Sequence, residues 1–316
     1  MIEESTPETA PKEFAAVRKV ALELLCATEQ GNRFIDELLA ERIGGFDPRD
    51  RRLLQEISYG ALRHQNTLDR LLKAYLKLSM DRQAVVVRWA LRLGAYQLVY
   101  LSRVPAHAAV NQTLEGMKSL EGGGKKEVGF VNAVLHRLAR DITRKTSEPP
   151  AERDDPNVLP SRDGFCHFNR PVLPLVRLDL VDHLGVKYSY PRWLVESWIA
   201  RFGAGETAEL LVAGNRPPKM YARVTSRAPS LADALAELES EGFKVEAGPQ
   251  EGSVLFAGGG PGPSLALEKG WIQFQDLTSM QIGAALAPPA NARVLDLCSA
   301  PGGKAAQLLD GLGEEG

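Results

Sequence analysis

The chain has 316 residues, of which 44% are hydrophobic and 25% are charged, and its formal net charge at pH 7 is −2. This composition is ordinary for a soluble globular protein of two or three domains, and three cysteines without zinc-like spacing exclude a disulfide framework and a zinc site. No apolar run approaches the roughly 20 residues that span a bilayer. The acidic N-terminus is unlike a secretory signal, so we expect a cytoplasmic protein. We also expect a monomer that binds no metal.

The N-terminal part of the chain, from Phe14 to Lys145, shows helical periodicity throughout. Residues 85–100 form its most apolar stretch, which we expect to be a central helix. Five or six further amphipathic helices with short connections predict a compact all-α domain over residues 1–145. Two polar residues of this region, His107 and Asn132, are expected to cap or bridge helices rather than to catalyse a reaction.

A basic stretch lies inside this helical region. Residues 51–145 carry 17 Lys or Arg and 7 Asp or Glu, a net charge of +10. Such a stretch suits a polyanion and favours RNA as a partner. Solvated helix faces also carry many basic residues, so the charge alone leaves both interpretations open.

The middle of the chain divides into a polar segment and a small mixed region. Residues 146–189 begin with a stretch rich in Pro, Asp, Arg and Ser that has no periodicity, and we interpret them as a linker. Residues 190–262 predict a small α+β subdomain of alternating helices and short strands. The run 258–263, which is Gly-Gly-Gly-Pro-Gly-Pro, predicts a flexible turn into a last region, residues 263–316.

The last region contains the most informative motif, Asp296-Leu-Cys-Ser-Ala-Pro-Gly-Gly-Lys304, which is followed by Ala-Ala-Gln-Leu-Leu. Val294, Leu295 and Leu297 predict a short buried strand, the two glycines predict a tight turn, and the apolar residues after them predict a helix. Such a unit places helix N–H groups where nucleotide-like ligands bind. A P-loop is disfavoured, because Ala305 stands where that motif needs Ser or Thr.

This motif resembles the S-adenosylmethionine (SAM) loop of the RNA cytosine-C5 methyltransferases, and the wider chain resembles their RsmB/Sun (Fmu) family, which acts on small-subunit (16S) rRNA. The family commonly has Ala where this chain has Ser299. The resemblance implies a Rossmann-like α/β methyltransferase domain, and SAM as the cofactor. It assigns cofactor binding to seven residues: Cys298, Ser299, Ala300, Pro301, Gly302, Gly303 and Lys304.

Two further elements carry the same resemblance. The run from Gly270 to Gln281 is similar to a family element that precedes the SAM strand, and it places Gln275, Asp276 and Ser279 near the cofactor. Asp276 is equally interpretable as a helix N-cap, and the two roles are compatible. The helical region resembles a NusB-like RNA-binding fold through several strings: Arg49-Asp-Arg-Arg-Leu-Leu, Ser58-Tyr-Gly-Ala-Leu-Arg63, Leu93-Gly-Ala-Tyr-Gln-Leu98, Val104-Pro-Ala-His-Ala-Ala-Val-Asn111 and Gly129-Phe-Val-Asn-Ala-Val-Leu135.

The resemblance also implies a catalytic mechanism that uses two cysteines in Pro-Cys and Thr-Cys motifs downstream of the SAM loop. Neither motif occurs before Gly316, so no residue of this chain is assigned as the catalyst, and Cys298 is not the nucleophile. We expect a truncated methyltransferase whose last domain is incomplete and whose activity is doubtful. The alternative function is a non-catalytic, NusB-like RNA-binding module associated with transcription.

Overall fold

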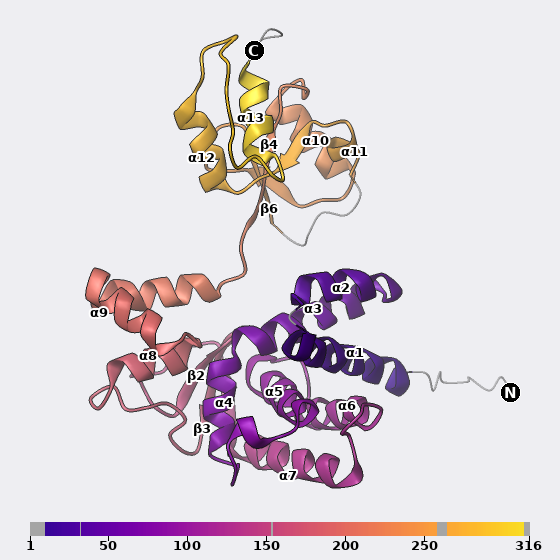
Figure 1. Cartoon of the computed structure of the whole chain (residues 1–316), viewed down its shortest axis with the longest axis vertical. Helices are drawn as coiled ribbons and strands as arrows, with labels where there is room; N and C mark the ends of the chain where they lie inside the picture. Colours follow the sequence, from indigo (N-terminus) through magenta and orange to yellow (C-terminus); the bar gives the residue numbers. More distant parts are fainter. Residues whose placement is uncertain (1–9, 32, 153, 258–263, 313–316) are drawn as a thin grey trace, which may run out of the picture. The chain divides into compact units, whose positions relative to one another are not determined.

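The structure is a computed structural model that describes residues 10–31, 33–152, 154–257 and 264–312. The chain forms two compact units, residues 1–216 and residues 217–316 (Figure 1). The predicted turn at 258–263 lies outside the described residues. None of the described helices is long and apolar enough to cross a membrane.

The first unit is built around a helical bundle whose central helix is α5, Val85–Tyr100. Fourteen of its 16 residues are buried, so the helix is surrounded by its neighbours and the predicted central position is confirmed. Helix α3 begins after Asp47, whose carboxylate accepts hydrogen bonds from the N–H groups of Arg49 and Asp50, each at 2.8 Å. The other helices of the bundle are α1 Ala10–Gly31, α2 Ile35–Arg42, α3 Pro48–Arg63, α4 Gln65–Lys73, α6 Ala106–Lys118 and α7 Lys125–Asp141, with short 3-10 turns at Ile43–Gly45 and Met80–Arg82.

A buried polar chain connects three of these helices. Arg18 of α1 donates through Nε to Oε1 of Gln97 in α5 at 3.0 Å, and Gln97 Nε2 donates to Oγ1 of Thr113 in α6 at 2.9 Å. The hydroxyl of Thr113 donates in turn to the carbonyl of Ala109 at 2.7 Å. Burial lowers the pKa of Arg18 to about 10, while the nearby charge of Asp50 opposes the shift. The guanidinium therefore stays charged at neutral pH, and its hydrogen bonds fix the register of α1 against α5.

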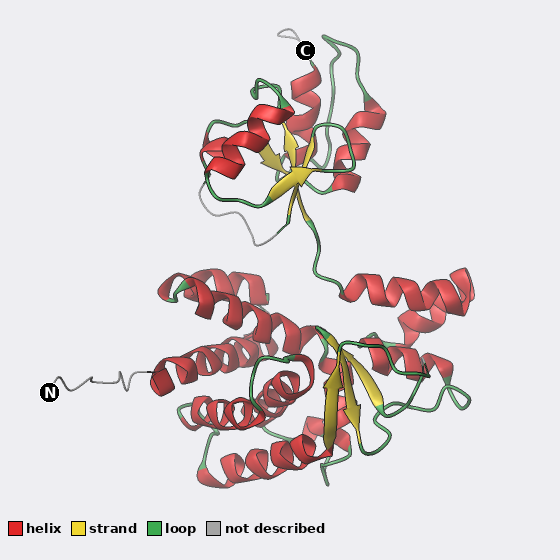
Figure 2. Cartoon of the chain, turned by 180° about the vertical axis from the view of Figure 1, so that it is seen from behind, coloured by secondary structure: helices red, strands yellow, loops and turns green. Residues whose placement is uncertain are grey.

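The prediction of a linker over residues 146–189 is wrong for most of that segment. Strands β1 Ile142–Thr146, β2 Val158–Ser161 and β3 Gly164–Phe168 form an antiparallel sheet in the order β1-β3-β2 (Figure 2). Leu159, Cys166 and Phe168 are buried in the same core as the helices. The strands are four or five residues long, which is too short for alternation to be visible among so many polar residues.

Two helices follow the sheet, α8 Leu180–Tyr188 and α9 Arg192–Asn215. Thr67 of α4 donates a hydrogen bond to the carbonyl of Val186, at 2.5 Å, which joins α8 to the bundle. Gly203 interrupts α9 with a φ of 78°, so the segment contains two helices. The first unit extends to residue 216, whereas we predict a boundary at 190, because α8 and α9 pack against each other around Val195 and Leu211.

The second unit contains a four-stranded antiparallel sheet in the order β5-β6-β4-β7. Its apolar core includes Ala222, Val254 and Ile272 from the sheet and Leu238 from a covering helix. This arrangement confirms the predicted small α+β fold. The elements are β4 Met220–Val224, α10 Leu231–Ser240, β5 Val245–Ala247, β6 Ser253–Phe256, α11 Leu265–Glu268, β7 Ile272–Phe274, α12 Leu277–Leu286 and α13 Gly303–Gly311.

The three thiols provide a test of the ordered sheet. Burial raises the pKa of Cys166 to about 12 and, together with Glu29, raises that of Cys26 to about 11, whereas Cys298 is exposed. Because the thiolate is the reactive form, a chromogenic disulfide reagent at about pH 8 should label one thiol rapidly in the native chain and three in denaturant. Cys298→Ser should abolish the rapid phase, and Cys166→Ser should leave it unchanged. Rapid labelling of Cys166 would show that the sheet is not formed and that the predicted linker is correct there.

Candidate functional site

The motif Cys298–Lys304 forms an exposed loop that leads into helix α13. Cys298, Ser299, Ala300, Pro301 and Lys304 are exposed, and the two glycines between them are partly buried. The side chain of Asp296 accepts a hydrogen bond from the N–H of Cys298 at 3.0 Å, which fixes the start of the loop. The structure thus brings all seven predicted cofactor-binding residues together at the beginning of one helix.

The predicted strand before this loop is not formed. Residues 292–296 have irregular backbone, and Val294, Leu295 and Leu297 are 38%, 82% and 85% exposed. A buried strand needs neighbouring strands to pair its N–H and C=O groups. Within the described residues of the second unit, every strand belongs to the antiparallel sheet, and none of them pairs with this segment.

The two glycines of the loop differ in what they contribute. Gly302 is the N-cap of α13 and has a φ of 106°, which side-chain-bearing residues rarely adopt. Gly303 begins the helix, and a Cβ placed on it would meet no atom within 4 Å. The first N–H groups of α13 have no partner within the helix, so a negatively charged or polar group can approach them from the open side. Lys304 adds an exposed positive charge beside these groups.

The three residues predicted to lie near the cofactor have different environments. Gln275 is buried and donates a hydrogen bond to Oε1 of Gln307 in α13 at 2.8 Å, which connects it to the helix of the loop. Asp276 caps α12, because its carboxylate accepts from the N–H of Thr278 at 2.8 Å. Ser279 is half-buried in α12, and its role at the cofactor stays a prediction.

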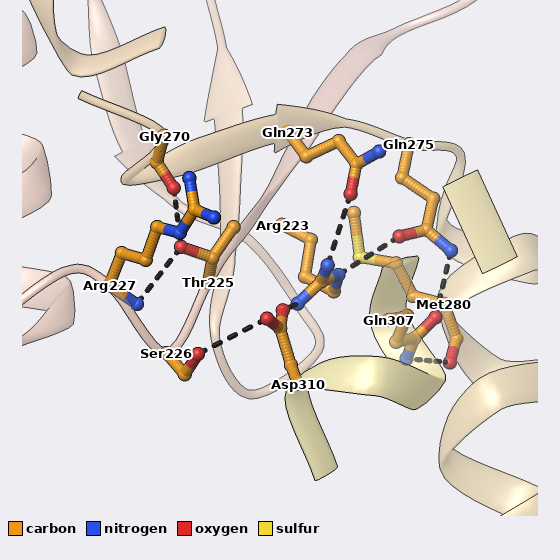
Figure 3. Close-up of polar contacts among 10 residues, drawn as sticks. All are labelled: Arg223, Thr225, Ser226, Arg227, Gly270, Gln273, Gln275, Met280, Gln307 and Asp310. Atoms are coloured by element: carbon orange, nitrogen blue, oxygen red, sulfur yellow. Dashed lines mark hydrogen bonds and ion pairs between the residues drawn. The ribbon is translucent and has the colours of Figure 1, made fainter. Parts of the chain in front are cut away.

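A polar network that the sequence analysis missed holds α13 against the sheet (Figure 3). Arg223 of β4 donates through Nε to Oε1 of Gln275 and through Nη2 to Oε1 of Gln273, both at 3.1 Å. Its Nη1 forms an ion pair with Asp310 of α13. Ser226 also donates to Asp310, at 3.1 Å. Arg223 is 87 residues from Asp310, and no local pattern marks such a pair.

Thr225 is a second residue whose role the sequence did not reveal. In the structure the hydroxyl of Thr225 donates to the carbonyl of Gly270 at 2.5 Å and accepts from the N–H of Arg227 at 3.2 Å. The residue therefore keeps a polar role, which is to fix the turn after β4.

The basic stretch of the first unit is distributed over several surfaces and the interior. Arg92 is buried and forms a bidentate pair with Asp69, with distances of 2.7 and 2.8 Å. Arg88 pairs with Glu29. Other basic residues, including Lys125 and Arg137, are exposed on α7. The net charge of +10 therefore overstates the charge available on any one face.

Comparisons with known proteins identify two families along the chain. The model of the NusB family matches residues 15–140, and the model described as Methyltr_RsmF/B-like, ferredoxin-like domain matches residues 190–256. The second match begins with α9. A Bacillus subtilis protein named "Probable ribosomal RNA small subunit methyltransferase B" is 30% identical over 298 residues, which are 93% of this chain and 60% of that protein. A Synechocystis sp. protein of the same name is 31% identical over 276 residues, which are 85% of this chain and 54% of that protein.

The chain thus spans between a half and two thirds of the length of these curated relatives. Among solved structures, the one described as "Crystal Structure of PH0851" matches with a TM-score of 0.61 and 18% sequence identity. The match covers 98% of this chain and 62% of that one. At this identity it shows a shared fold alone.

The network at Arg223 predicts a measurable loss of stability in the second unit. Arg223→Met should lower the free energy of unfolding by about 3 kcal/mol, because it leaves Asp310 and the side-chain amides of Gln273 and Gln275 without their shared donor. Hydrogen exchange at the amides of α13 measures the effect. Arg227→Met is the matched control, since Arg227 is exposed and should change stability by less than about 0.5 kcal/mol. Equal protection of α13 in the two variants would contradict this account.

Proposed function

We propose that this chain, which belongs to the RsmB/Sun family of small-subunit ribosomal RNA methyltransferases, takes part in SAM-dependent methylation of cytosine C5 in 16S rRNA. The names of its relatives support methylation of small-subunit rRNA. The loop Cys298–Lys304 supports SAM as the methyl donor, because five of its seven residues are exposed at the start of α13. The choice of cytosine C5 rests on the likeness of that loop to the RNA cytosine-C5 methyltransferases.

The residues of the loop fit a polar or negatively charged group, such as the carboxylate of SAM. Gly302 allows the backbone to turn sharply, and the space at Gly303 leaves the main chain open to close approach. In this proposal the first N–H groups of α13 bind the ligand's carboxylate, and Asp296 and Lys304 limit where it lies. SAM when bound supplies an electrophilic methyl group to the target base.

The chain's own contribution in this proposal is binding and orientation. Gln275 and Arg223 hold α13 in place through Gln307 and Asp310. The half-buried thiol of Cys26 and the buried thiol of Cys166 have raised pKa values and are unsuited to nucleophilic attack near neutral pH. We therefore assign no catalytic residue among the described ones. The NusB-like helical region supplies the contact to rRNA, and the site of action is the cytoplasm.

The alternative of a non-catalytic NusB-like module has less support. It would use only the helical region and would leave the match at residues 190–256 unexplained. It would also leave the exposed loop before α13 without a purpose. The two functions are separated by whether the chain binds SAM.

Binding of SAM by the purified chain is the first prediction of this proposal. Gly302→Val should weaken binding about tenfold or more, because a side chain at a φ of 106° costs about 1–3 kcal/mol and forces the loop to shift. Gly311→Ala is the control at the other end of α13, where a Cβ meets no atom within 4 Å. Isothermal titration calorimetry measures both. Absence of SAM binding by the parent chain would favour the non-catalytic alternative.

The reaction itself is tested in cells. Deletion of the gene should remove 5-methylcytosine from a position in small-subunit rRNA, as read by bisulfite sequencing. Expression of the whole gene, unchanged or with Gly311→Ala, should restore the mark, and the same gene with Gly302→Val should restore less of it. If every cytosine mark persists in the deletion strain, the proposed reaction is wrong.

A further inference from the structure

A groove of about 910 Å³ lies between α6 and α7 in the first unit. Each helix contributes four residues with the spacing i, i+3, i+4, i+7, which places them on one helix face. Asn111, Leu114, Glu115 and Lys118 come from α6, and Lys125, Val128, Gly129 and Asn132 come from α7.

The groove is open because α7 has a glycine where a side chain would fill it. A Cβ on Gly129 would meet no atom within 4 Å, and the residue is exposed. Gly123 and Gly124, from the connection between the helices, also line the groove and add no side chains. A volume of this size lies within the range of about 300–1,000 Å³ in which proteins bind ligands.

The polar groups of the groove suit RNA. We predict from the sequence that Asn132 caps or bridges helices, but neither it nor Asn111 forms a side-chain hydrogen bond with any described residue. An Asn amide offers a donor and an acceptor, which complement the edges of nucleobases. Both amides are therefore free to recognise a ligand.

The charge of the groove favours a polyanion. Lys118 and Lys125 are exposed and line it, and Glu115 is the acidic residue among the lining residues. Lys118 Nζ lies 2.5 Å from Glu115 Oε1, but both side chains are more than half exposed, so this pair contributes little and does not prevent contact with a phosphate. The exposed side chains of Lys126, Arg137 and Arg140 extend the positive charge along α7.

From this combination we infer that the α6–α7 groove binds single-stranded RNA, with Asn111 and Asn132 contacting bases and Lys118 and Lys125 contacting phosphates. A single strand is the suitable form, because base edges are accessible to side chains in unpaired RNA and poorly accessible in an A-form duplex. This inference rests on the proposed function, since it names the surface through which the chain contacts rRNA.

The test uses the full chain and a single-stranded RNA of about a dozen nucleotides of mixed sequence, with the matching duplex as a second probe. Gly129→Leu should fill the groove and weaken binding of the single strand about tenfold or more. Gly205→Leu is the matched control, because Gly205 is also a helical, exposed glycine whose Cβ would meet no atom within 4 Å. The far-UV circular dichroism spectrum and the thermal midpoint of the helical region should be unchanged in both variants, which shows that the first unit is folded.

The charge contribution is tested separately. The double variant Lys118→Gln, Lys125→Gln should reduce the slope of log affinity against log salt concentration by about 1.4, the value for two phosphate contacts to a single strand. If Gly129→Leu binds the single strand as tightly as Gly205→Leu, the groove is not the RNA site, although the proposed function stands. Equal affinity for the duplex overturns the single-strand assignment. If the parent chain binds SAM but binds neither the single strand nor the duplex, the groove inference is wrong, and so is the proposal that the helical region contacts rRNA.

Discussion

The position of the candidate cofactor loop depends on one buried guanidinium. Arg223 is 8% exposed in a short strand. An unpaired charge is very unfavourable at such a buried position, so acceptor groups from other elements must lie within hydrogen-bond distance of the guanidinium. They come from β7, from Gln275 directly after β7, and from α13. Since α13 begins directly after the glycine turn, the same contacts that satisfy Arg223 determine where the first N–H groups of that helix lie. The contacts that stabilise the sheet at Arg223 therefore also fix the position of the loop.

The first unit uses the same principle for its helices. Arg18, Gln97 and Thr113 connect α1, α5 and α6 through hydrogen bonds inside an otherwise apolar core. Apolar contacts alone allow a helix to slide or rotate at small cost, whereas a buried donor that loses its acceptor costs about 1–3 kcal/mol. The polar chain therefore selects one register. It fixes α6 relative to the buried α5, and the face of α6 that meets α7 follows from that placement.

The sequence was sufficient where structure is determined locally. The helices of the bundle follow from periodicity, the cap at Asp276 from its position before α12, and the turn at Gly302 from the conformational freedom of glycine. Contacts between residues far apart in the sequence could not be predicted from it. The sheet of residues 142–168 depends on pairing between short strands, and the Arg223–Asp310 pair joins positions 87 residues apart. The strand expected at Val294 shows the converse, because its apolar residues specify a strand only when neighbouring strands are present to pair with it.

The two surfaces assigned here, the loop and the groove, both use glycine, but for different physical reasons. Gly302 is required by its backbone conformation, so any side chain there strains the turn. Gly129 has ordinary helical geometry, and a larger residue would stabilise α7 by about 0.5–1 kcal/mol. Nothing lies within 4 Å of a Cβ placed there, so a larger residue would occupy the groove rather than the core. If the groove binds RNA, this glycine leaves space for the ligand at that small cost in helix stability.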